Sequence, residues 1–145
     1  MWHILKKSLL ILAIIVIADQ AFSYVFIHAF FLKTISGESG GTINYVIEKN
    51  PHPDFLILGA SRAKEQIDPS LLTSLGTNGY NLGINGNTVL ASSLILDILL
   101  RNGVKPKTLV LQTDSSDYVV GVDQNIKDQV DRVYPYDTPL IRSYE

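Results

Sequence analysis

The N-terminal third of the chain is almost continuously apolar. Residues Ser8–Ala18 are nearly all Leu, Ile, Val and Ala, Asp19–Gln20 interrupt the run, and Ala21–Leu32 is again mostly apolar and aromatic. Together they are long enough to cross the hydrocarbon core of a bilayer as one helix. Because Lys6–Lys7 precede the run, the positive-inside rule places the N-terminus in the cytoplasm. We therefore predict an anchor over residues 1–33, a single pass through the cytoplasmic (inner) membrane, with the rest of the chain extracytoplasmic.

A cleaved signal peptide is the alternative interpretation of this segment, because Ser8–Ala18 has the length of a signal-peptide core. No Ala-x-Ala cleavage site follows it and the apolar residues resume, which favours the anchor. Asp19 inside the span is costly unless it is paired or hydrated. It indicates either a contact with a partner membrane protein or a kink or interfacial position that Gln20 and Tyr24 stabilise.

After residue 33 the pattern changes to short apolar runs that alternate with segments of helical periodicity. Residues 34–54 are predicted to form a linker and a short helix from Thr42 to Lys49, with Thr42 as its N-cap. A longer helix is predicted to begin after Thr88, as its cap, and to end before Gly103. The predicted strands are Phe55–Leu58, Tyr80–Leu82 and Thr108–Gln112, and the shorter helical segments are 62–66, 68–76 and a candidate within Val122–Val133.

Strands that alternate with helices indicate βαβ units and a parallel sheet. The apolar run of Phe55–Leu58 is continuous, so this strand is predicted to be buried on both faces. Residues 55–145 are therefore predicted to be an α/β domain, a partial three-layer (flavodoxin-like) parallel sheet that follows the N-terminal transmembrane helix. Because a third strand is the last one found, it is expected to leave an open apolar edge through which residues 37–145 associate.

Charge and composition exclude several functions. The formal net charge is −2, so no basic surface indicates nucleic-acid binding. The chain has no cysteine, which excludes thiol catalysis, disulfides and cysteine-based metal sites. The acidic stretch from Asp117 to Asp131 lacks the spacing of a metal-binding loop and is predicted to be a solvated face. No metal and no cofactor are predicted.

The most informative motif lies where the first strand ends. Gly59 closes the apolar run, Ser61 follows two residues later, and Arg62–Gln66 is polar, as expected of a first helical turn. This turn lies at the carboxyl edge of the sheet, where open α/β folds bind ligands, and at a helix N-terminus, whose N–H groups favour negative charge. Such a setting suits a nucleophilic serine. The alternative is that Ser61 is an ordinary helix N-cap.

Polar blocks also follow the other two strands, Asn81–Thr88 after the second and Asp114–Asp117 after the third. The three blocks, with Gly59–Ala63 reading Gly-Ala-Ser-Arg-Ala, resemble the SGNH (GDSL-like) hydrolase superfamily. More narrowly, they resemble its membrane-anchored bacterial branch, which is associated with acyl esters on envelope polysaccharides and whose first block often reads Gly-Ser-Ser-Arg-Ala or Gly-Thr-Ser-Arg. The resemblance covers most of residues 5–145 and reaches the first half of a typical member, so we expect the chain to be the N-terminal part of such a protein.

The resemblance implies roles for individual residues. Ser61 is implied to be the nucleophile and its own N–H the first oxyanion donor, with the N–H of Gly86 as the second donor. Only glycine allows the backbone to approach a substrate that closely. Asp114 stands where the family supplies an asparagine side chain, and an ionised carboxylate there would repel an oxyanion.

Three neighbouring residues are open to two interpretations each. Arg62 either binds an acidic group of the substrate or pairs with Asp114 or Asp117. Asn85 and Asn87 either contact the substrate or serve the geometry of a glycine-rich turn.

The family's last block has no counterpart in this chain. That block is an Asp-x-x-His pair near the C-terminus, whose histidine is the general base that activates the serine. No histidine follows His52, and His52 precedes the first strand, so it should emerge a strand length away from Ser61. A serine without a base is a weak nucleophile, so the chain as given is predicted to be inactive or nearly so.

The function implied by the resemblance is that of a membrane-anchored serine esterase or acyltransferase acting on O-acyl esters, with O-acetyl groups expected, of cell-envelope glycans. The implied partners are the membrane and an acylated glycan. A partner membrane protein is expected only on the first of the two interpretations of Asp19. The alternative function is that of a non-catalytic extracytoplasmic scaffold or glycan-binding relative of the family.

Overall fold

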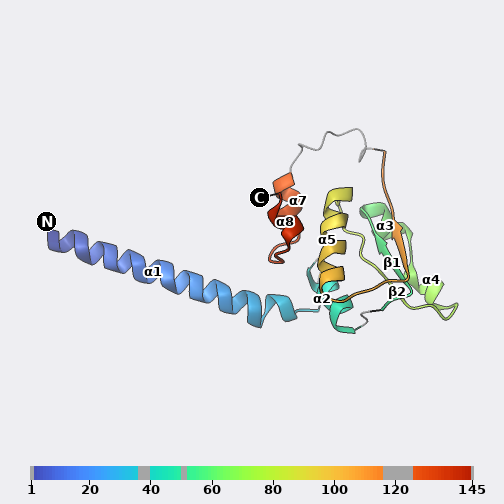
Figure 1. Ribbon diagram of the computed structural model, residues 1–145, viewed down its shortest axis with the longest axis horizontal. Helices are drawn as coiled ribbons and strands as arrows, with labels where there is room; N and C mark the ends of the chain where they lie inside the picture. The colour runs from blue at the N-terminus through green and yellow to red at the C-terminus, as the bar shows by residue number, and fades with distance from the viewer. Residues whose placement is uncertain (1, 36–39, 50–51, 116–125, 145) are drawn as a thin grey trace. The chain divides into compact units, whose positions relative to one another are not determined.

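The computed structural model describes residues 2–35, 40–49, 52–115 and 126–144. The chain divides into two compact units, Met1–Thr34 and Ile35–Glu145, which are described separately. The features predicted at residues 36–39, Asp117 and 122–125 lie outside the described residues. In chain order the elements are α1 (Trp2–Ala29), the 3-10 helix η1 (Phe31–Lys33), α2 (Gly40–Lys49), β1 (Phe55–Leu58), α3 (Ser61–Gln66), α4 (Pro69–Thr73), β2 (Gly79–Asn81), α5 (Val89–Arg101), β3 (Thr108–Leu111), α7 (Ile126–Asp131) and α8 (Pro139–Arg142) (Figure 1).

The first unit is the apolar helix that the sequence predicts, and α1 continues through Asp19 and Gln20. Its 28 residues correspond to about 42 Å of helix, against roughly 30 Å for the hydrocarbon core of a bilayer. No side chain of α1 is buried in the protein. Within the described part of the chain, this is the one helix long and apolar enough to cross a membrane. It is compatible with a membrane anchor or with a signal sequence.

The second unit contains a small parallel sheet with the strand order β2-β1-β3 (Figure 1). Ile57 of β1 lies in register with Asn81 of β2 and with Val110 of β3. All four residues of β1 are buried, which confirms the prediction that this strand is covered on both faces. Because the strands are parallel, the polar segments that follow them all emerge at the same edge of the sheet.

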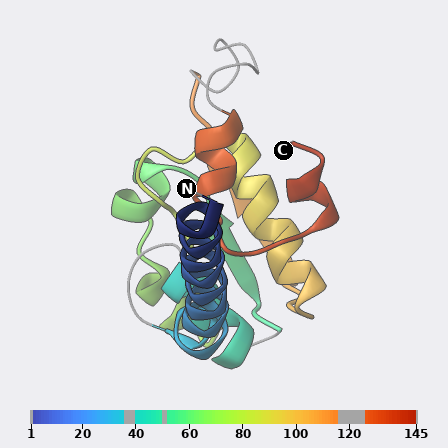
Figure 2. The same ribbon diagram turned by 90° about the vertical axis from the view of Figure 1, so that its left-hand side faces the viewer.

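Helices cover the two faces of β1 unequally. On one face α5 contributes most of the core, and α7 and α8 pack on α5, which lies between them and the sheet (Figures 1 and 2). On the other face, Phe55 and Ile57 form a small cluster with Ala63 of α3 and with Ile67, which follows α3. The buried residues of the main core are Ile43, Val46, Leu56, Leu58, Leu82, Leu94, Ile95, Ile98, Leu99, Val104, Val130, Val133 and Ile141.

Helix α2 is part of this core. It begins at Gly40, so Thr42 lies inside the helix and the prediction that it is the N-cap is wrong. Both glycines of its first turn are buried, where tertiary packing outweighs their weak helix propensity. The Tyr136 hydroxyl donates a hydrogen bond to Asn44 Oδ1 at 2.5 Å, and burial raises the pKa of Tyr136 to about 12. Tyr136 is therefore a packing residue that holds α2 against the C-terminal part of the unit.

The boundaries of α5 agree with the sequence signals. Thr88 is the N-cap, and its Oγ1 accepts a hydrogen bond from the Ala91 N–H. The helix ends at Arg101, and Gly103 follows with a φ of 83°, the left-handed conformation typical of a residue just after a helix.

Strand β3 is an edge strand of the sheet that the described residues form. The N–H groups of Thr108 and Gln112 donate to the carbonyls of Asp54 and Leu58 on the β1 side, so by the alternation of a strand the N–H groups of Leu109 and Leu111 face away from β1. All four β3 residues are exposed, and Val110 retains 40% of its accessible surface. An apolar edge of this kind favours pairing with another strand.

We expect residues 37–145 to associate through this edge, and Val110→Lys to make them monomeric. A lysine at the centre of the strand would place a charge in any new strand pair. Light scattering coupled to size exclusion measures the change. Leu100→Lys is the matched control, because Leu100 is an exposed apolar residue of α5 outside the sheet. A monomeric wild-type segment would contradict the prediction.

Asp54 joins the strands at the opposite, amino edge of the sheet. Its Oδ1 accepts from Lys107 Nζ at 2.6 Å, just before β3, and its Oδ2 accepts from the Asn78 N–H at 2.8 Å, just before β2. The hydrogen bond from Lys107, followed by that from Asn78, lowers the pKa of Asp54 from 3.8. The ionised form of Asp54 is therefore favoured in the folded state.

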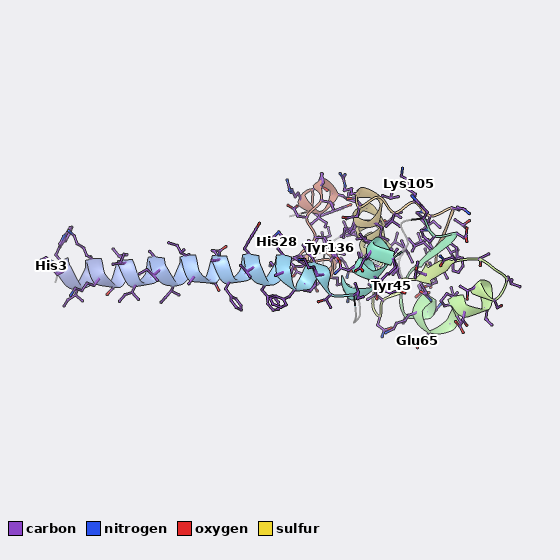
Figure 3. All side chains as sticks on the ribbon, turned by 90° about the horizontal axis from the view of Figure 1, so that it is seen from below. His3, His28, Tyr45, Glu65, Lys105 and Tyr136 are labelled. Carbon is purple, nitrogen blue, oxygen red and sulfur yellow. The ribbon has the colours of Figure 1, made fainter. Side chains whose placement is uncertain are left out.

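We therefore expect the protein to lose stability as the pH falls, and we expect Asp54→Asn to remove part of this pH dependence. Since the folded pKa lies below the unfolded value, the stabilisation is fully present above pH 3.8 and is lost as the pH falls through the folded pKa. Urea unfolding should show wild type more stable than Asp54→Asn at neutral pH, with the difference shrinking in acid. Glu65→Gln serves as the control, since Glu65 is exposed on α3 (Figure 3). A difference that does not depend on pH would argue against this ion pair.

Candidate functional site

Ser61 is the first residue of α3 and its side chain is exposed. The N-cap is Ala60, which makes no side-chain capping bond. The interpretation of Ser61 as an ordinary N-cap is therefore wrong, and its hydroxyl is not used to close its own helix. The Ser61 N–H belongs to the first turn of α3, whose N–H groups have no carbonyl partner within the helix. Hydroxyl and N–H are thus both presented at the carboxyl edge of the sheet.

The turn before Ser61 depends on Gly59. Its φ is 153°, a conformation that side chains rarely adopt. A Cβ added here would lie 2.8 Å from both Cβ and Oε1 of Gln112, the residue that follows β3. The same Oε1 accepts a hydrogen bond from the Ala60 N–H at 3.1 Å. The first polar block is therefore in direct contact with the end of the third strand.

The second polar block meets the first through the Gly59 carbonyl. This oxygen accepts from the Ile84 N–H at 3.1 Å and from Asn87 Nδ2 at 3.3 Å. Asn81, at the end of β2, donates from Nδ2 to the carbonyls of Ala63 and Ile67 at 2.6 and 2.7 Å. The first and second polar blocks and the end of the third strand, far apart in the sequence, thus come together around the turn that presents Ser61.

Asn85, Gly86 and Asn87 have different surroundings. Asn85 and Gly86 are exposed, and Gly86 has a φ of 67°. Asn87 is 5% exposed, and its Nδ2 also donates to Ser92 Oγ at 2.9 Å. Asn87 therefore orders the loop from inside, while Asn85 and Gly86 face solvent. The Asn87 Oδ1 atom is buried without a partner among the described residues.

Arg62 and Asp114 form an ion pair, with Nη1 and Oδ1 2.9 Å apart. Asp114 Oδ1 also accepts from Gln112 Nε2 at 2.8 Å. Of the two interpretations of Arg62, the pairing is therefore observed, and the negative charge of Asp114 is offset by the guanidinium. Its other predicted partner, Asp117, lies outside the described residues.

Within the second unit, no histidine lies beside Ser61 among the described residues. His3 and His28 belong to α1 (Figure 3). His52 is the sole histidine of residues 35–145 and precedes β1, whereas Ser61 follows it. Four residues of strand separate the two ends by about 13 Å. The distance agrees with the expectation that His52 cannot serve Ser61.

Arg132 is a residue of this edge that sequence reasoning missed. Its Nη1 donates to the Asn85 carbonyl at 3.0 Å, and its Nη2 lies 3.3 Å from where a Cβ on Gly86 would be. In the sequence Arg132 only ends an acidic, polar stretch. The two contacting residues are 47 positions apart, so no local motif signals their contact.

Comparison with known proteins does not place the chain in a family. No protein-family model, no curated protein and no solved structure matches it.

Replacing Gly59 with alanine is expected to lower the free energy of unfolding by about 2–6 kcal/mol, because a strained φ costs about 1–3 kcal/mol and overpacking about 1–3 kcal/mol more. Urea unfolding of the full chain in detergent measures the change. Gly76→Ala is the matched control: Gly76 has a φ of 83° but no atom within 4 Å of the added Cβ, so it should lose about 1–2 kcal/mol. Equal losses would show that contact with Gln112 is not the constraint.

Proposed function

We propose that Ser61 is the nucleophile of a serine esterase or acyltransferase of SGNH type, attached to the outer surface of the cytoplasmic membrane by α1. Its substrate would be an O-acyl ester, with O-acetyl the simplest case, on a cell-envelope glycan. One observation carries the proposal. Ser61 is exposed at a strand-to-helix turn that the second polar block and Gln112, at the end of the third strand, hold in place through Gly59 and Ala60.

The oxyanion donors of the proposal are backbone N–H groups. Among the described residues, neither the Ser61 N–H nor the Gly86 N–H donates to a carbonyl. A developing negative charge on the ester oxygen needs such unpaired, fixed donors. The exposed Gly86 has no side chain to keep a substrate away from its N–H.

In the proposed reaction Ser61 Oγ forms a bond to the acyl carbon while the bond from that carbon to the glycan oxygen breaks. The Oγ proton passes through a base to the departing glycan oxygen. The acyl-serine then reacts with water, which is hydrolysis, or with another hydroxyl, which is transfer. Because His52 lies at the far end of β1, the proposal requires a base other than the histidine of residues 35–145.

Non-catalytic binding of acylated glycan is the second candidate, and the position of His52 favours it. In that case the same exposed loop at Asn85 and Gly86 would hold the ester without cleaving it. A serine that is not activated by a base remains a weak nucleophile.

Labelling with a fluorophosphonate distinguishes the two candidates. We expect the protein in its own membrane fraction to carry the phosphonate on Ser61, detected by mass spectrometry of the Ser61 peptide. Ser61→Ala should abolish the adduct. Ser93→Ala should keep it, because Ser93 is an exposed serine of α5 whose Oγ bonds to the Val89 carbonyl.

The result that would overturn catalysis is an unlabelled Ser61 in membranes where another serine hydrolase is labelled. Retained binding of an acetylated glycan by that unlabelled protein would then support the second candidate. If Ser61 is not labelled and the protein does not bind the acetylated glycan, both candidate functions are rejected.

A further inference from the structure

We propose that Arg132 forms an anion-binding subsite beside Gly86, and that the glycan bound at this edge carries a carboxylate or phosphate group. This inference rests on the proposed function for the acyl ester itself. The contacts and charges that favour an anion here do not involve Ser61. It identifies the substrate class as an acidic acylated glycan rather than a neutral one.

The backbone on both sides of Arg132 is anchored in the core. Val130 and Val133 are 8% and 1% exposed. Gln129, one turn earlier, accepts a hydrogen bond from the hydroxyl of Thr88, the N-cap of α5, at 3.1 Å. Arg132 itself is exposed. A long polar side chain therefore leaves a fixed point of the backbone and ends at the loop that follows β2.

The guanidinium lies against Gly86. Arg132 Nη1 donates to the Asn85 carbonyl at 3.0 Å. A Cβ on Gly86 would be 3.3 Å from Nη2 and 3.9 Å from Cζ of Arg132. The contact with a backbone carbonyl orients the group without neutralising its charge. The remaining N–H groups of the guanidinium stay available for a ligand.

Charge pairing sets Arg132 apart from the other arginines of the chain. Arg62, Arg101 and Arg142 each form an ion pair, with Asp114, Asp97 and Asp137 respectively. Arg132 is the remaining one of the four arginines of the sequence, and within the described residues it pairs with no carboxylate. The uncompensated guanidinium is thus the one that lies over the candidate oxyanion loop.

A planar guanidinium matches the paired oxygens of a carboxylate or a phosphate. Either group, placed on the glycan a short distance from its ester, would reach Arg132 while the ester lies near Gly86. The contact between Arg132 and this anionic group would have the same strength in the bound substrate and in the transition state of acyl transfer. It should therefore affect substrate binding and not the rate of the chemical step.

The test measures binding by the full chain in detergent to three oligomers that carry no acyl group: oligogalacturonate for carboxylate, a glycerol-phosphate oligomer for phosphate and xylo-oligosaccharide as the neutral probe. Wild type should bind one of the anionic probes at least about tenfold more tightly than the neutral one, and salt should weaken that binding. The preferred anionic probe identifies the anion.

Three variants assign this preference to the guanidinium. Arg132→Gln should remove the tenfold preference, and Arg132→Lys should keep part of it, because lysine keeps the charge but loses the bidentate geometry. Arg101→Gln is the matched control, because Arg101 is an exposed arginine of α5 that pairs with Asp97. This variant should keep the full tenfold preference. Equal binding of anionic and neutral probes by wild type, or equal losses in Arg132→Gln and Arg101→Gln, would overturn the proposal.

Because the probes carry no acyl group, failure here is distinguishable from failure of the proposed function. Anion preference that depends on Arg132, together with an unlabelled Ser61, would keep the subsite and reject the acyl-serine chemistry. Labelled Ser61 without anion preference would keep the chemistry and reject the subsite.

Discussion

The turn from β1 into α3 is the constraint on which the rest of this edge depends. Gly59 has a backbone conformation that side chains rarely adopt, and Gln112 leaves no room for a Cβ there. Its carbonyl accepts from Ile84 and Asn87 of the second block, while the Ala60 N–H donates to Gln112, the residue that follows β3. The dipeptide Gly59–Ala60 thus joins the turn after β1 to the loop after β2 and to the end of β3. It leaves the side chain of Ser61 exposed.

The two edges of the sheet use their charges differently. At the amino edge, Asp54 receives Lys107 and the Asn78 N–H, so its charge joins the starts of the strands. At the carboxyl edge, Arg62 is matched by Asp114, whereas Arg132 contacts only a backbone carbonyl among the described residues. The carboxyl edge therefore keeps one guanidinium available beside unpaired N–H groups, which is the electrostatic arrangement that an anionic ester substrate requires.

Two features of the second unit show what acyl transfer would still need. His52, the histidine of this unit, precedes β1, whereas Ser61 follows it. The proton of Ser61 therefore has no histidine of this unit as its acceptor at the carboxyl edge. Strand β3 has all four residues exposed and N–H groups directed away from the sheet. Any segment or partner that pairs with β3 would end at the same carboxyl edge as Ser61 if it ran parallel. Strand pairing is therefore one physical route by which a base could be brought to Ser61.

Local patterns in the sequence determined the elements. The continuous apolar runs predicted α1 and the double-sided burial of β1, and the Thr88 and Gly103 signals predicted the limits of α5, because propensity, capping and burial act over a few neighbouring residues. The parallel order of the strands also made it predictable that Ser61, Gly86 and Asp114 share one edge. Tertiary structure alone decided that α2 packs into the core through Tyr136, that Asn87 is buried, and that Arg132 reaches Asn85. These outcomes depend on contacts between residues tens of positions apart, and the free energy of such contacts leaves no periodic trace in the sequence.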